Sequence, residues 1–133
     1  MRRFITAAEG LPQWTSPISH AVVVDRHCYL SGQLSLDTQG RLLPGTAAEE
    51  AHRAFEHLFR ALAAAGFERS DLVFIDIAFL DLADLPQVNA VYERLFPAGQ
   101  RPARTVYQAA GLPFGGKVKV QGVAVREAEA GGA

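Results

Sequence analysis

The sequence is poor in the residues that build cross-links and metal centres. It contains one cysteine, Cys28, one methionine and one tryptophan among 133 residues. A lone cysteine cannot close a disulfide within the chain, and it cannot supply the thiolate pairs of a cysteine-based zinc site. Cys28 lies in an apolar run, so we interpret it as a small buried hydrophobic residue.

An excess of charge of one sign is also lacking. Thirteen Lys and Arg residues face fourteen Asp and Glu residues, which gives a formal net charge of -1. Proteins that bind nucleic acid normally carry a basic face, so we expect no nucleic-acid partner. No apolar run approaches the roughly 20 residues of a membrane helix, and the N-terminus has no apolar signal core. We therefore expect a cytoplasmic globular protein with no membrane partner.

Apolar residues, in contrast, are abundant enough for a sizeable core. They make up 49% of the chain, and the length is that of one ordinary domain. We predict a single domain over residues 1–126. The last segment, 127–133, consists of Glu, Ala and Gly, and we predict a flexible tail there.

Apolar residues at helical spacing predict two helices. The first begins at Thr46, where Thr46 and Glu49 form a capping box, and it ends at Gly66. The second begins at Asp84, interpreted as its N-cap, and it ends before Pro97. Both predicted helices present one apolar face, which indicates that each packs against a sheet.

Runs rich in β-forming residues predict the strands of that sheet. These runs lie near residues 2–6, 21–24, 27–31, 72–80, 104–109 and 117–126. The run 72–80 is apolar on both sides, which suits a strand that is covered on both faces. Two helices can cover only one face, so we expect another copy of the chain to cover the other.

Two histidines on the first predicted helix do not form a metal site. His52 and His57 lie five residues apart, so their side chains point in directions that differ by roughly 100°. Helical metal ligands lie three or four residues apart. We interpret both histidines as solvated residues of the helix surface.

Two charged residues near predicted strands fit a functional site. Asp76 interrupts the apolar run 72–80, and it fits either a site carboxylate or a hydrogen-bonded carboxylate of the core or an interface. Arg104 begins a strand, and Pro102 restricts the backbone just before it. A guanidinium held in this way can bind a carboxylate through two parallel hydrogen bonds. The alternative for Arg104 is a surface salt bridge.

Several short motifs occur in an order that is specific as a set. They are Pro17-Ile-Ser-His-Ala-Val, Tyr29-Leu-Ser-Gly-Gln33, Val88-Asn-Ala-Val-Tyr92, Arg101-Pro-Ala-Arg104 and Leu112-Pro113. With them the chain resembles the Rid/YjgF family of reactive-intermediate (enamine/imine) deaminases over roughly residues 16–126. The resemblance implies a chorismate-mutase-like α+β fold, a sheet of about six strands with a pair of helices on one face. It also implies a homotrimer with clefts between its subunits.

The resemblance further implies an activity and a set of site residues. The family hydrolyses small carboxylate-bearing enamines and imines to keto acids and ammonia, without a metal or an organic cofactor. Arg104 corresponds to the arginine that binds the substrate carboxylate. Ser31 and Asn89 correspond to residues that line the cleft, with Ser31 in the catalytic group. Phe114 is expected among the residues that contact the substrate.

Three positions depart from the family pattern. Ile18 stands where the family usually has a site tyrosine, and His20 stands where it has a glutamine. Gln121 stands at the position of the family's catalytic glutamate. A glutamine can hold a water molecule but cannot accept its proton. We therefore expect an altered substrate, and slow hydrolysis of simple 2-imino acids unless His20 or another group supplies the base.

Two functions follow from these residues. The first is hydrolytic deamination of small imines or enamines. The second is a non-catalytic trimer of the same family that binds small carboxylates and serves in regulation. Arg104 favours a carboxylate ligand in both. Ribonuclease activity, attributed to some family members, is disfavoured by the near-neutral charge and by a lack of exposed aromatic platforms.

Overall fold

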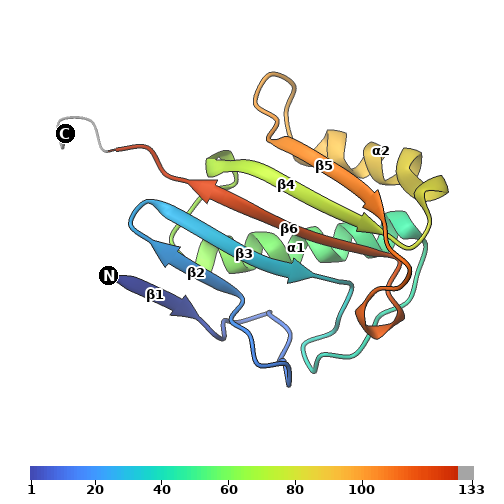
Figure 1. The fold of residues 1–133 in the computed structure, drawn as a ribbon, viewed down its shortest axis with the longest axis horizontal. Helices are drawn as coiled ribbons and strands as arrows, with labels where there is room; N and C mark the ends of the chain where they lie inside the picture. The colour runs from blue at the N-terminus through green and yellow to red at the C-terminus, as the bar shows by residue number, and fades with distance from the viewer. Residues whose placement is uncertain (129–133) are drawn as a thin grey trace.

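The computed structural model describes residues 1–128 as one six-stranded sheet with two helices packed on one of its faces (Figure 1). The elements are β1 Arg2–Ile5, β2 Ala21–Val24, β3 His27–Gln33, α1 Ala47–Ala64, β4 Leu72–Phe79, α2 Leu85–Leu95, β5 Ala103–Gln108 and β6 Val118–Val125. The predicted order of strands and helices and the α+β class are confirmed. Of the predicted tail, residues 129–133 lie outside the described residues.

The strand order is β1-β2-β3-β6-β4-β5. All neighbouring strands are antiparallel except β4 and β5, which are parallel and joined by a crossover through α2. β5 pairs with β4 alone and forms one edge of the sheet. This topology places the start of β5, where Arg104 lies, beside α2.

The first helix follows its sequence signals closely. Thr46 and Glu49 form the predicted capping box, with each side-chain oxygen accepting a backbone N–H of the other residue. Gly66 has φ +86°, a conformation that glycine adopts without strain, and the chain leaves the helix there. The predicted apolar stripe is buried against the sheet; it consists of Ala51, Phe55, Leu58, Phe59 and Leu62. Burial of each large side chain stabilises the fold by about 1.5–3 kcal/mol.

Two predictions about the helices are wrong in detail. Asp84 precedes α2 but makes no capping hydrogen bond; it accepts one from the Gln87 side chain instead. The reason is a 3-10 turn, Leu82–Asp84, which runs directly into α2 and is capped by Asp81. His57 is buried rather than solvated, because α1 also packs against the loop after β3, where its Nε2 donates to the Leu36 carbonyl at 2.7 Å.

The sheet has one face turned away from the helices, which we call the open face. Side chains of β4 alternate: Ile75, Ile77 and Phe79 are fully buried under the helices, while Phe74 and Asp76 point to the open face and are partly exposed. Within one chain, therefore, the apolar run of β4 is covered on one side only.

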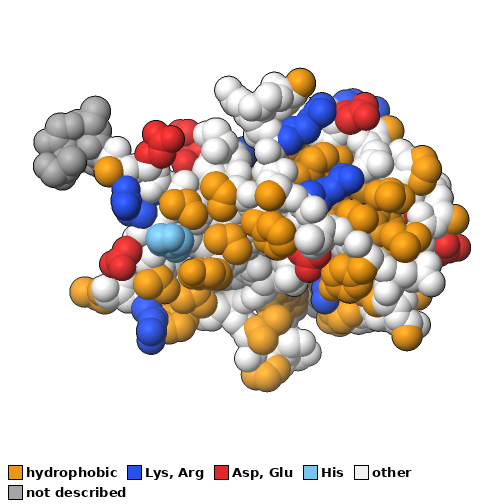
Figure 2. Space-filling model, turned by 45° about the horizontal axis from the view of Figure 1, so that its top comes forward, with side chains coloured by type: hydrophobic (Ala, Val, Ile, Leu, Met, Phe, Trp, Pro, Cys, Tyr) orange, Lys and Arg blue, Asp and Glu red, His pale blue; other side chains and the backbone are white. Residues whose placement is uncertain are grey.

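The open face is rich in apolar side chains. Phe4, Tyr29 and Tyr107 point to it with exposed fractions of 60%, 51% and 43%. Figure 2 shows hydrophobic side chains gathered over much of the face in view, with few charged ones among them. The expectation that exposed aromatic residues are lacking is wrong, because alternation along the edge and central strands places these rings outside the core.

Cys28 lies fully buried in β3, and burial raises the pKa of its thiol to about 11. It is thus the small core residue that the sequence predicted. Neither α1 nor α2 is long and apolar enough to cross a membrane.

Candidate functional site

Arg104 lies on the helix side of the sheet. Its register partner on β4 is Ile75, which is buried under the helices, so the Arg104 side chain lies over α2. There its Nη1 donates to Asn89 Oδ1 at 2.9 Å, and its guanidinium carbon lies 4.7 Å from the centre of the Tyr92 ring. A hydrogen bond and a cation–π contact from one helix therefore orient the guanidinium before any ligand binds.

A pocket of about 320 Å³ opens at this place. It is lined by Asn89, Tyr92, Glu93, Arg101, Pro102 and Arg104. Within residues 1–128, neither Arg101 nor Arg104 forms an ion pair with a carboxylate. Two arginines without acidic partners make the pocket suitable for a small anion.

Tyr92 adds a polar group to this pocket that sequence reasoning missed. Its side chain is 5% exposed, and its hydroxyl has no hydrogen-bond partner among the described residues. Burial raises the pKa of Tyr92, while the nearby Arg104 opposes the shift. The hydroxyl is therefore protonated at neutral pH and can donate a hydrogen bond to a bound anion.

A second group of polar residues crosses the open face. It contains Ser31 on β3, Gln121 on β6, Asp76 on β4 and Thr105 on β5, and we call it the polar row. Asp76 is the direct register partner of both Gln121 and Thr105. On β3, Leu30 pairs with Gly122 of β6, so Ser31 follows beside Gln121, just where the ladder between the two strands shifts register before Gln33.

Hydrogen bonds join three members of the polar row, Gln121, Asp76 and Thr105. The Gln121 Nε2 donates to Asp76 Oδ2 at 3.3 Å, and the Thr105 hydroxyl donates to Asp76 Oδ1. The Ser31 hydroxyl donates to the Ser19 carbonyl at 2.6 Å. Since Ser31 uses its proton in this bond, its oxygen is left to accept a hydrogen bond from a ligand.

The pocket of Arg104 and the polar row lie on opposite faces of the sheet. Consecutive residues of β5 point to opposite sides, so Arg104 faces α2 while Thr105 faces Asp76 and Gln121. Within one chain the structure brings Arg104 together with Asn89, and Ser31 together with Gln121. It does not bring these two pairs to one cavity.

The backbone carbonyl of His20 accepts the Ser31 N–H at 3.0 Å, but its imidazole contacts neither group. It is 1% exposed, its Nε2 donates to the Pro12 carbonyl at 3.0 Å, and its Nδ1 accepts from Gln33 Nε2 at 2.9 Å. Burial lowers the pKa of His20, opposed by the hydrogen bond to Pro12. Neither ring nitrogen is left for a ligand, which argues against the prediction that His20 contacts the substrate or acts as a base.

The remaining predicted residues are exposed. Ile18 is 56% exposed, in the loop before β2, and Phe114 is 50% exposed, in the turn before β6. Phe114 has φ 62°, which is uncommon for a bulky residue. Neither side chain lines the pocket of Arg104 in the single chain, and their contact with a substrate stays a prediction.

Among residues 1–128, no cluster of three or more His, Cys, Asp or Glu side chains is placed to hold a metal ion. The polar groups of the site are instead amide, hydroxyl, guanidinium and two carboxylates, Glu93 at the pocket of Arg104 and Asp76 in the polar row. From the sequence, Asp76 fitted either a site carboxylate or a hydrogen-bonded carboxylate of the core or an interface. Its contact with Gln121 spans 45 positions, so no local pattern could have signalled it.

Comparisons with known proteins agree with this architecture. The family profile described as Endoribonuclease L-PSP matches residues 10–126. A protein of Bos taurus named 2-iminobutanoate/2-iminopropanoate deaminase is 40% identical over 127 residues, which cover 95% of this chain and 91% of the relative.

Solved structures superpose along nearly the whole chain. RidA from the Antarctic bacterium Psychrobacter sp. PAMC 21119 has a TM-score of 0.86 at 30% identity, covering 93% of this chain and 100% of its own. E. coli TdcF with bound serine has a TM-score of 0.86 at 26% identity, covering 94% of this chain and 100% of its own. With a family profile over most of the sequence and a relative at 40% identity, the chain belongs to the Rid/YjgF (L-PSP) family.

Proposed function

We propose that this protein hydrolyses small carboxylate-bearing imines and enamines to keto acids and ammonia. The observation that carries the proposal is Arg104, oriented by Asn89 and Tyr92 at a pocket whose two arginines have no acidic partner among the described residues. The name of the bovine relative, an iminobutanoate and iminopropanoate deaminase, supports this substrate class. The bound serine in TdcF supports a ligand with a carboxylate next to a nitrogen-bearing carbon.

Arg104 is the proposed anchor for the substrate carboxylate. Its guanidinium can form two parallel hydrogen bonds with the carboxylate, and the Tyr92 hydroxyl can add a third. Fixing the substrate in this way contributes to rate because the reacting carbon of an iminium is already electrophilic and needs chiefly a well-placed water. Asn89 acts through Arg104 as a positioning residue.

The complete site is proposed to form between copies of the chain in a cytoplasmic homotrimer. Arg104 and the polar row lie on opposite faces, so one ligand can reach both only if a second copy supplies one of them. The apolar open face offers the surface on which a neighbouring copy packs. In this arrangement Ser31 and Gln121 of one copy complete the pocket of Arg104 in the next.

Ser31 and Gln121 then act on the reacting atoms. With its proton engaged by Ser19, the Ser31 oxygen accepts a hydrogen bond from the nitrogen of the substrate. The Gln121 amide donates to Asp76, which leaves its carbonyl oxygen to accept a hydrogen bond from the attacking water. Ile18 and Phe114 are proposed to supply apolar contacts, and Ile18 in place of a tyrosine favours a substrate with an apolar side chain.

The test is ammonia release from a panel of 2-imino acids produced in the assay by an amino acid oxidase. We expect release faster than the spontaneous rate, and a preference within the panel for an apolar side chain. Binding of 2-oxobutyrate without any acceleration would contradict the enzyme function. That result would instead favour the second candidate, a regulatory trimer that binds small carboxylates through Arg104.

A further inference from the structure

Asp76 is a carboxylate in the middle of the open face, and it has no role in the proposed binding of the substrate carboxylate by Arg104. It stands directly between Gln121 and Thr105 in the register of three adjacent strands. Phe74 and Ala78 flank it along β4, so its surroundings on this strand are apolar. A carboxylate in such a place requires partners, because leaving it without them is costly.

The partners of Asp76 orient it without neutralising it. Thr105 donates to one carboxylate oxygen and Gln121 to the other, and both donors are uncharged. Within the described part of the chain no cation forms an ion pair with Asp76. Lys119 points to the same face, but its register partner on β4 is Ala78, two residues beyond Asp76. A carboxylate has about four lone-pair positions, so two remain to accept a proton or a hydrogen bond from water.

We propose that Asp76 is the proton acceptor for the attacking water, in the place of the carboxylate that position 121 lacks. This inference rests on the proposed deaminase function and adds a catalytic residue to it. Gln121 and Asp76 together hold the water, the amide through its oxygen and the carboxylate through a free lone pair. The pair contains one amide and one carboxylate, so the site keeps a base although residue 121 is not one.

The proton balance of the reaction then closes on Asp76. As the water oxygen bonds to the iminium carbon, the C=N π electrons move to nitrogen and a water proton moves to the Asp76 carboxylate, giving a neutral carbinolamine. Asp76 returns this proton to the amine nitrogen. The hydroxyl proton then passes to the carboxylate while the carbonyl forms and the C–N bond breaks, releasing ammonia, which takes up that proton as ammonium.

The contact with Asp76 also explains why a glutamine suits position 121. A glutamate there would place two carboxylates in direct register, and such neighbours repel each other. An amide instead donates its N–H to Asp76 and keeps the carboxylate oriented. Gln121→Glu alone is therefore expected to give no gain in kcat. A gain of about tenfold or more would mean that the parent lacks a base, and it would overturn the inference.

The direct test is Asp76→Asn, measured by ammonia release from 2-iminobutanoate. We expect kcat to fall by about 10²–10⁴-fold, the usual contribution of a general base. KM should change little, because the Arg104 anchor is intact. The matched control is Asp25→Asn, the same chemical change in an exposed turn with φ 53°, a conformation that asparagine tolerates. A kcat of Asp76→Asn within about threefold of the parent would overturn the inference.

The exchange variant Asp76→Asn/Gln121→Glu separates chemistry from structure. It keeps one carboxylate and one amide in the pair, and only their strands are exchanged. We expect its kcat to exceed that of Asp76→Asn by about tenfold or more. Circular dichroism and the light-scattering mass establish that each variant keeps the parent's fold and assembly. If Asp76→Asn does not, the folded exchange variant decides: restored turnover supports the inference, and turnover at the spontaneous rate contradicts it.

Ammonia release by the parent chain distinguishes a failure of the proposed function from a failure of the proposed role of Asp76. A parent that releases no ammonia from any imine of the panel overturns both. A parent that is active, together with an equally active Asp76→Asn, overturns only the role of Asp76.

Discussion

Arg104 is oriented by contacts that one chain supplies by itself. Asn89 fixes one edge of the guanidinium, and the Tyr92 ring lies beneath it. Because these contacts exist without a ligand, little further ordering of the side chain is required on binding. The affinity of the site should therefore depend strongly on this single residue.

Arg104→Ala is expected to weaken binding of 2-oxobutyrate by about 2–5 kcal/mol, because the ligand carboxylate loses its charged partner. Arg104→Lys should restore only part of the affinity, since an ammonium cannot form the two parallel bonds. Titration calorimetry measures both. Arg94→Ala, on an exposed position of α2 outside the pocket, serves as control. Equal affinities for Arg104→Ala and the parent would refute the anchor.

Two buried histidines make stability depend on pH. Burial lowers the pKa of both His20 and His57 in the folded chain, opposed by their hydrogen bonds to the carbonyls of Pro12 and Leu36. In the unfolded chain each titrates near its ordinary pKa of about 6.5. Below that pH the unfolded state binds more protons than the folded state, so stability falls as the pH drops.

We expect urea unfolding to give a lower free energy at pH 5 than at pH 7.5, by up to about 1.4 kcal/mol per pH unit for each histidine. His20→Gln removes one titrating group and should make the dependence shallower. An unaltered slope in His20→Gln would exclude His20 as a source of the effect.

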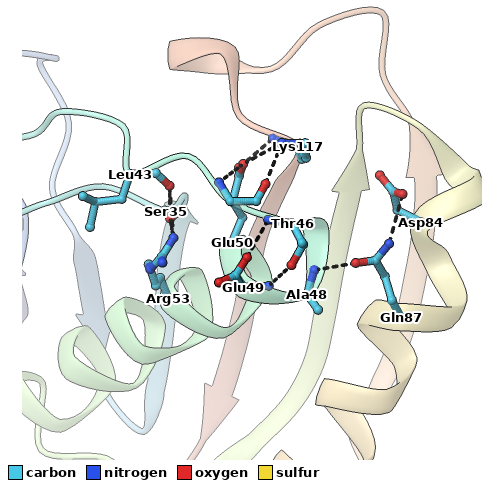
Figure 3. A network of polar contacts seen from close by, with 11 residues as sticks. Ser35, Leu43, Thr46, Ala48, Glu49, Glu50, Arg53, Asp84, Gln87 and Lys117 are labelled. Atoms are coloured by element: carbon cyan, nitrogen blue, oxygen red, sulfur yellow. Dashed lines mark hydrogen bonds and ion pairs between the residues drawn. The ribbon is translucent and has the colours of Figure 1, made fainter.

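At the scale of elements, the N-terminus of α1 is tied to both the sheet and the second helix (Figure 3). Glu50 is 1% exposed and accepts the Lys117 backbone N–H at 2.9 Å at the entrance to β6. The Lys117 Nζ lies 3.4 Å from the same carboxylate and donates to the Gly45 carbonyl. Gln87 of α2 accepts the Ala48 N–H at 3.0 Å, which joins the helices.

Glu49 and Glu50 provide a matched pair on one helical turn. Glu50→Ala should destabilise the fold by about 1–3 kcal/mol, because it leaves the backbone N–H groups of Lys117 and Gly45 without their acceptor. Glu49→Ala removes only the exposed side of the capping box, so its effect should be clearly smaller. Thermal and urea unfolding measure the difference. Equal losses would contradict the assignment of Glu50 as the link between α1 and β6.

At the scale of the whole molecule, the open face and the separation of the two polar groups lead to the same assembly. In the proposed trimer, a neighbouring copy packs on this face, covers Phe4, Tyr29 and Tyr107, and joins Arg104 to the polar row. We expect light scattering to give three times the chain mass of 14.4 kDa. Tyr29→Glu on the open face should lower that mass, while Leu82→Glu, an exposed residue outside the sheet, should not. The mass of one chain for the parent would refute the trimer.

A mixing experiment tests whether one site draws on two copies. Trimers assembled from Arg104→Ala and Asp76→Asn chains contain some interfaces where an intact Arg104 meets an intact Asp76. Random mixing in a cyclic trimer makes about one quarter of the interfaces intact, so about one quarter of the activity should return. Activity no greater than that of the two separate variants would place both residues in a site within one chain.

Local sequence determined the elements and much of the site's chemistry. The capping box of Thr46, the apolar stripe of α1 and the strands are signalled within a few neighbouring residues, since helical and strand periodicity are local properties. The motif around Arg104 likewise predicted the anchor and, through the family, its ligand class. These features were predictable because the residues that produce them are adjacent in the chain.

Only the tertiary structure decided which residues meet. The register of β4 against β6 and β5 sets Asp76 between Gln121 and Thr105. A slip of β4 by one residue would turn Asp76 to the face opposite to Gln121 and Thr105. The burial of His20 against Pro12 and Gln33 depends on loops whose paths no periodic pattern encodes. Contacts across strands and loops are set by the packing of the whole core, so the proposed base became visible only in the folded chain.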